Sequence, residues 1–121
     1  LGAARLVVGS SGYEQCGAPL EIPHAGSDPA LSSLGSTALL AFSYSPTPED
    51  RVLGLLVLDG DGRPIGSPCA VAPSRPVTND PDVACTRGLC AVAWMEGSTY
   101  DGDDFITRVL QVPVSPDLRC P

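Results

Sequence analysis

The feature that most constrains this chain is a weak internal repeat with a spacing of 52 residues. Three segments recur at this spacing: residues 28–29 at 80–81, 39–42 at 91–94, and 57–58 at 109–110. Few of the aligned residues are identical, but the apolar clusters of the two copies stay in step. Repeats of this length are typical of stacked supersecondary units, each of which buries its apolar faces only against a neighbour. The repeat therefore constrains the architecture much more than the chemistry.

The composition indicates a turn-rich, ordered β protein. Thirteen Gly and thirteen Pro separate apolar runs in a chain that is 43% hydrophobic, so we expect almost no helix. The run 52–58 is apolar at consecutive positions, which predicts a strand covered on both faces. The expected strands cover residues 5–8, 19–22, 30–33, 38–45, 52–58, 70–72, 83–85, 90–95 and 105–112.

Cysteine spacing extends the repeat to both ends of the chain. Cys16, Cys69 and Cys120 fall near one phase of the repeat, at the ends of comparable strand-turn segments. This predicts a single all-β unit of about two and a half repeats, and such a piece leaves broad apolar faces that something else must cover. The predicted parts are the tail of a preceding unit over residues 1–27, a first repeat over 28–79 and a second over 80–121.

Charge and hydropathy argue against two classes of partner. The chain has 14 acidic and seven basic residues, a formal net charge of −7, so we expect no nucleic-acid binding through a basic surface. No stretch of 18 or more apolar residues is present, so we expect no membrane insertion. Because the chain begins at Leu1, we expect a piece cut from a longer protein.

One family resemblance rests on residues 81–94, which read P-x-V-A-C followed by G-x-C-x-V-x-W, and on L-D-x-x-G at 58–62. These segments resemble the blades of secreted bacterial β-propeller repeat proteins, and the likeness covers most of residues 16–121. The resemblance implies a β-propeller-type fold and secretion, but no particular activity, because propellers serve many functions. The first copy departs from the pattern, with Ser33 and Ala38 in place of Cys85 and Cys90.

The predicted fold class is therefore all-β, built of propeller-type blades of antiparallel strands. A β-sandwich is the alternative, because short strands with turns at regular intervals suit that architecture as well. The internal repeat favours the propeller.

The spacing of two cysteines predicts a disulfide. Cys85 and Cys90 flank a predicted turn, so they face each other across a hairpin within disulfide reach, with free thiols or metal ligands as the alternatives. The pairing of Cys16, Cys69 and Cys120 stays open, and one of the five cysteines is left over. Five cysteines are many for a reducing cytosol, so we expect an extracellular or cell-surface location.

Any ligand is expected at two loops in matching positions, over 45–50 and 97–104. The second loop supplies the candidate ligand-binding residues Tyr100, Asp101, Asp103 and Asp104. We predict no metal and no cofactor, with calcium held by these acids beside Glu96 as the alternative. By contrast, Phe42 and Trp94 end apolar runs and are expected in the core.

Nothing in the sequence predicts catalysis. His24 is the only histidine, and no Ser or Cys near it lies in a recognisable nucleophile context. We therefore predict a non-catalytic extracellular structural or protein-interaction module, part of a larger propeller assembly. The alternatives are a glycan-binding lectin and the non-catalytic portion of a secreted hydrolase. Expected partners are other blades or chains of the same assembly, or identical copies that close a ring.

Overall fold

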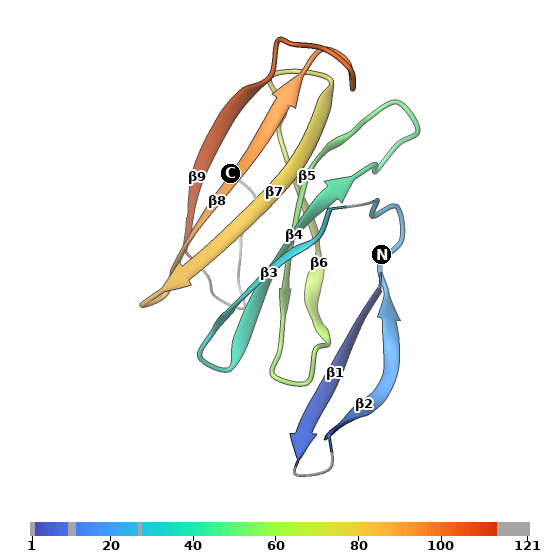
Figure 1. Cartoon of the computed structure of the whole chain (residues 1–121), viewed down its shortest axis with the longest axis vertical. Helices are drawn as coiled ribbons and strands as arrows, with labels where there is room; N and C mark the ends of the chain where they lie inside the picture. Colours follow the sequence, from blue (N-terminus) through green and yellow to red (C-terminus); the bar gives the residue numbers. More distant parts are fainter. Residues whose placement is uncertain (1, 10–11, 27, 114–121) are drawn as a thin grey trace.

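The computed structural model describes residues 2–9, 12–26 and 28–113, with side chains from residue 19 onward. These residues form nine strands and no helix, arranged in three antiparallel sheets (Figure 1). The strands are β1 (Gly2–Gly9), β2 (Gly12–Glu21), β3 (Ala30–Leu34), β4 (Thr37–Tyr44), β5 (Val52–Leu58), β6 (Pro64–Val71), β7 (Val77–Thr86), β8 (Leu89–Gly97) and β9 (Ile106–Pro113). The predicted all-β class is confirmed.

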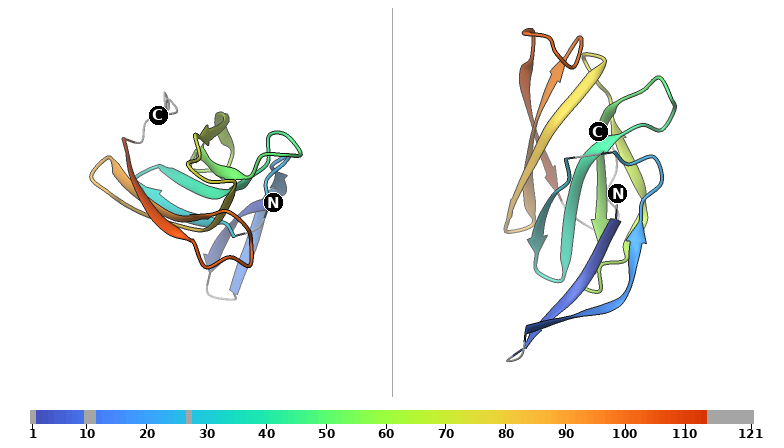
Figure 2. Two further views of the ribbon diagram at one scale, coloured as in Figure 1. Left: turned by 90° about the horizontal axis from the view of Figure 1, so that it is seen from above. Right: turned by 45° about the vertical axis from the view of Figure 1, so that its right-hand side comes forward.

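The three sheets follow one another in chain order. Figure 1 shows the β1–β2 hairpin at lower right, the four-stranded sheet β3-β4-β5-β6 in the middle, and the three-stranded sheet β7-β8-β9 at upper left. Each sheet is a meander in which strands adjacent in sequence pair. The two further views in Figure 2 show that the larger sheets are not closed into a barrel.

Three strands begin at least six residues earlier than the sequence predicted. β6 begins at Pro64 although only 70–72 was expected, and β7 begins at Val77 although only 83–85 was expected. Pro and Gly within these strands looked like strand breakers. Pro has no backbone N–H, but an edge strand tolerates it because one side of that strand makes no ladder hydrogen bonds. Both extensions contain a bulge in the pairing, where such residues fit. Likewise, β2 extends the predicted 19–22 backward to Gly12.

The main core lies between the four-stranded and three-stranded sheets. β5 is buried at all seven positions, which confirms that both of its faces are covered. Burying this much aliphatic surface provides the main driving force for sheet packing. The buried cluster between the sheets consists of Leu39, Ala41, Leu53, Leu55, Val57, Cys69, Val71, Cys90, Val92, Trp94 and Val112.

A second cluster covers the opposite face of the four-stranded sheet. Its buried members are Leu40, Phe42, Leu56 and Leu58, together with Ile22 just after β2. Leu20 and Ala25 pack against the same cluster. The four-stranded sheet is therefore sandwiched between the three-stranded sheet and the segment that leads into it from β2. The expected burial of Phe42 and Trp94 is confirmed, since both lie in these cores.

The first hairpins of the two larger sheets have the same register when residue numbers are offset by 52. Leu34 pairs with Thr37 at one hairpin end, and Thr86 pairs with Leu89 at the other. The backbone conformation matches as well: Asp28 has a φ of 62° and Asp80 a φ of 49°, in the left-handed region that few non-glycine residues adopt.

The offset changes at the third strand of each sheet. Ala41 pairs with Leu55, but Ala93 pairs with Val109, so β9 lies two residues further along the chain than the 52-residue spacing predicts. The connection from β8 to β9 is two residues longer than that from β4 to β5, which accounts for the slip. The match of Val57 to Val109 is therefore wrong as a structural equivalence. Because the slip is an even number of residues, every side chain keeps its face.

Candidate functional site

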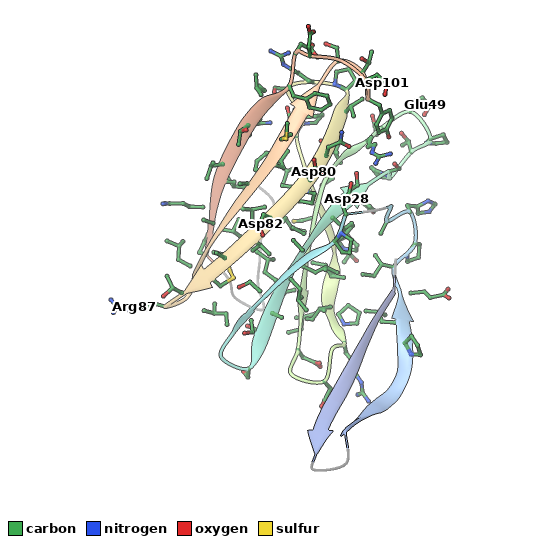
Figure 3. All side chains as sticks on the ribbon, viewed as in Figure 1. Asp28, Glu49, Asp80, Asp82, Arg87 and Asp101 are labelled. Carbon is green, nitrogen blue, oxygen red and sulfur yellow. A yellow bond between two sulfur atoms is a disulfide. The ribbon has the colours of Figure 1, made fainter. Side chains whose placement is uncertain are left out.

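The two predicted loops do lie together, at one end of the molecule. Figure 3 shows Glu49 and Asp101, from the β4–β5 and β8–β9 loops, at the same upper end. An open pocket of about 380 Å³ lies there. It is lined by Ser45, Pro48, Glu49, Asp50, Arg51, Pro76, Val77 and Tyr100.

An arginine and a tyrosine join the two loops. The Arg51 guanidinium lies 4.5 Å from the centre of the Tyr100 ring, and Arg51 Nε donates to Ser43 Oγ at 3.0 Å. Ser43 Oγ in turn donates to the carbonyl oxygen of Thr78 at 3.2 Å. This chain of contacts anchors Arg51 on β4 and β7, so one face of the Tyr100 ring is held by a fixed cation. Tyr100 as a whole remains 52% exposed.

The predicted acidic ligands do not converge. Asp101 and Asp103 are exposed on the loop, whereas Asp104 accepts hydrogen bonds from the backbone N–H and the hydroxyl of Ser98. Arg75 Nη1 also pairs with Asp104 Oδ2 at 3.1 Å. The hydrogen bonds from Ser98, with the Arg75 charge, lower the pKa of Asp104. Within the described part of the chain, no three His, Cys, Asp or Glu side chains gather in a way that could hold a metal ion.

Glu96, considered as a calcium ligand, lies instead in a buried network. Its side chain is 1% exposed and accepts from Trp94 Nε1 at 2.8 Å and from Arg108 Nη1 at 2.9 Å. The Ser74 backbone N–H and hydroxyl donate to its other oxygen at 2.9 and 2.5 Å. Arg108 also donates to the Ala72 carbonyl. Glu96 therefore ties the β6–β7 connection to β8 and β9.

The same contacts decide the chemistry of Glu96. Burial raises its pKa, but the hydrogen bonds from Ser74, Trp94 and Arg108 outweigh this effect and lower the pKa from 4.5 to about 2. This carboxylate has a low pKa, and each of its oxygens accepts two hydrogen bonds, so it is a poor general base near neutral pH. The network is suited to holding the structure together.

The predicted disulfide between Cys85 and Cys90 is present. The two residues pair directly across β7 and β8, with their Cα atoms 4.0 Å apart. Cys69 is disulfide-bonded as well. The side chains of Cys16 and Cys120 lie outside the described residues.

A second surface of interest is the outer face of the three-stranded sheet, the face turned away from the core. Its side chains alternate with the buried ones, and residues paired across neighbouring strands share the face. Val109 at its centre is 67% exposed and Leu89 is 41% exposed. We define the outer face by its apolar residues Ala84, Leu89, Ala91, Ala93, Met95 and Val109.

Sequence reasoning missed Arg51. It considered Glu96 only beside a calcium site, and it predicted broad apolar faces without locating the outer face. Arg51 immediately precedes a predicted strand, and only the meeting of two loops shows its contact with Tyr100. The outer face had a signal, because Ala91 and Ala93 match the buried Leu39 and Ala41 at the 52-residue offset.

Comparison with protein-family models, with curated proteins and with solved structures finds no match for this chain. The resemblance to β-propeller repeats thus rests on the residues quoted above. Residues 2–9, 12–26 and 28–113 include no helix with the length and apolar character of a transmembrane span.

Proposed function

We propose that this chain is a non-catalytic, extracellular structural or protein-interaction module of a larger assembly of propeller-type sheets. One observation carries the proposal: side chains related by the 52-residue offset point in the same direction along the stack of sheets. Phe42 faces the segment after β2, and Trp94 at the matching position faces the four-stranded sheet. Each sheet therefore turns its aromatic face toward the element that precedes it in the chain.

This arrangement supports the proposal of a propeller-type stack rather than a sandwich of two sheets related by a two-fold axis. Two related sheets that pack about a two-fold axis turn matching faces toward each other. Here Leu39 and Ala41 of the four-stranded sheet meet Val92 and Trp94 of the three-stranded sheet. The first two residues lie on the face that lacks the aromatic residue, and the other two lie on the aromatic face. Stacking of unlike faces does not end by itself, so it supports a partner for the last sheet.

The chemistry of the described residues supports a non-catalytic, extracellular role. Glu96 is saturated with hydrogen bonds, Asp104 is held by Ser98 and Arg75, and His24 lies exposed in a turn. Disulfides persist mainly in oxidising compartments, so the Cys85–Cys90 bridge supports secretion.

The test is the native mass of the protein isolated from its source, measured by light scattering after size exclusion, with intact-mass analysis of every component. We expect the chain to be bound to further chains or to be part of a longer one. A lone chain of this length, found as a monomer in material never exposed to denaturant, would contradict the proposal. Copurification with an active hydrolase would instead support the role of a non-catalytic portion of that enzyme.

A glycan-binding lectin is the second candidate function, supported by the pocket between the two loops. The exposed face of Tyr100 offers a stacking surface for a sugar ring, and Glu49 and Asp50 line the same pocket with acceptors for hydroxyl groups. Retention on immobilised carbohydrate tests this role: Tyr100→Ala should abolish retention and Tyr100→Phe should keep it. Equal retention by both variants would place binding elsewhere.

A further inference from the structure

We propose that the outer face of the three-stranded sheet is a docking surface for another antiparallel β-sheet of this same type, one that presents an aromatic row like that of Cys90, Val92 and Trp94. The proposal rests on the proposed function and names its partner: a sheet with that row, rather than an unrelated protein or a carbohydrate.

The first argument is structural equivalence with a surface that is already covered. Leu39 and Ala41 of β4 and Leu55 of β5 match Ala91, Ala93 and Val109 in strand register and face. The first set is buried against the three-stranded sheet, with Leu55 0% exposed. The second set faces outward, with Val109 67% exposed. The same face is thus covered in one sheet and open in the next.

The shape of the outer face fits an aromatic partner. Ala41 and Trp94 belong to one buried cluster, in which the small side chain leaves volume for the large one. Ala93 stands at the position that matches Ala41. Ala91, on the same face of the same strand, is smaller than its counterpart Leu39. A sheet that docks here therefore needs bulky side chains opposite these two alanines.

The rim of the outer face has the polarity of an interface. Asp82 on β7 pairs with Ala93, while Thr107 and Gln111 on β9 pair with Met95 and Ala91, so these polar residues share the face with the apolar centre. An apolar centre with a polar rim is the usual anatomy of a protein–protein interface.

A second copy of this chain does not supply the required row in the part that the structure describes. Phe42 and Leu40 are the matching row of the four-stranded sheet, but Leu20 and Ile22 already pack on them. Trp94 itself is buried between the sheets. The docking sheet is therefore a further unit rather than an identical chain.

The experiment is an insertion variant of the full chain in which residues 59–112 are repeated once after Val112. Val112 matches Leu58 in register, so the turn that follows Leu58 follows Val112 in the same way. The repeated copy carries Cys69→Ser to avoid an extra thiol. Because the parent chain has one Trp, the variant has two, and acrylamide quenching reports the accessibility of both.

We expect the quenching constant per Trp in the insertion variant to stay at the parent value, because the second Trp is buried on the outer face. Val109→Arg in the first copy should expose that second Trp. The matched control is Val109→Arg in the parent chain, which should leave quenching unchanged because Val109 is exposed there.

Three outcomes would overturn the docking surface: a second Trp as accessible as free indole, no effect of Val109→Arg in the insertion variant, or unfolding of the variant where the parent is folded. Failure of the proposed function is distinguishable. If the isolated protein is a monomer but the insertion docks, the assembly role fails and the surface stands. If a native complex forms equally well with Val109→Arg, the role stands and the surface is wrong.

Discussion

The four-stranded and three-stranded sheets begin alike and end differently. Their first hairpins share register and a left-handed Asp at matching positions, but the residue opposite the aromatic differs. Phe42 pairs with Gly54, where a Cβ would lie 2.5 Å from the ring, so the ring packs directly on the β5 backbone. Trp94 pairs with Arg108, whose guanidinium lies 5.1 Å from the centre of the Trp ring and also binds Glu96.

The difference shows that position in the stack decides how a face is used. The middle sheet is covered on both sides, so β5 is apolar throughout. Its Gly54 leaves room for the Phe42 ring of β4, and no charged side chain is needed there. The last sheet is covered on one side, so β9 alternates and its Trp is fixed by a charged network. Four predictions test this comparison.

The largest contrast is between Leu55 and Val109, which occupy matching positions. Leu55→Ala should lower the free energy of unfolding by about 2–5 kcal/mol, because it leaves a cavity between packed sheets. Val109→Ala should change it by less than about 0.5 kcal/mol, because its side chain is exposed. Urea unfolding followed by Trp94 fluorescence measures both. Equal effects would show that the outer face is packed in the isolated chain.

Glu96 should make the last sheet sensitive to acid. Its pKa is about 2 in the folded chain and near 4.5 when unfolded, so its stabilisation is complete above about pH 4.5 and is lost as the pH falls toward 2. The loss should reach at most about 3 kcal/mol.

The control for this pH dependence is Glu96→Gln, which removes the titrating group. Between pH 2 and pH 6, the urea midpoint should change less with pH for the Gln variant than for the parent. At pH 6 the Gln variant should unfold at a lower urea concentration than the parent. The same pH dependence in both proteins would assign the effect to other carboxylates.

The Cys85–Cys90 disulfide can be removed, and a matching one can be added to the first hairpin of the four-stranded sheet. Removal of the Cys85–Cys90 bridge by Cys85→Ser with Cys90→Ser leaves the disulfide of Cys69 in place. With five residues of sequence separation between Cys85 and Cys90, this loss should cost about 2 kcal/mol because the closed loop is short. Ser33 and Ala38 pair directly at the matching positions, so Ser33→Cys with Ala38→Cys should form a second hairpin bridge with a similar gain. Intact mass before and after alkylation, with thermal unfolding, checks both. A double variant with free thiols would show that the two hairpins differ in geometry.

The smallest effect is expected at the loop contact. Tyr100→Ala should lower stability by about 0.5–1 kcal/mol through loss of the contact with Arg51, and Tyr100→Phe should keep nearly all of it. Thermal unfolding measures the difference between the two variants. A fully stable Ala variant would mean that the two loops are held together by other contacts.

The amino-acid sequence by itself determined the local features. Alternation and breakers predicted the all-β class, the spacing of Cys85 and Cys90 predicted a hairpin bridge, and the unbroken apolar run 52–58 predicted a strand covered on both faces. These predictions succeed because each depends on residues near one another in the chain, where backbone geometry fixes which side chains meet.

The tertiary structure alone decided what distant segments do to one another. It brought Ser74 and Arg108 to Glu96, which holds this carboxylate in a buried network of hydrogen bonds. It also showed a two-residue slip in β9 that the repeat spacing had hidden, and it left Val109 exposed where the matching Leu55 is buried. Such contacts depend on loop length and on which sheet comes next, and neither is encoded in the local pattern of polar and apolar residues.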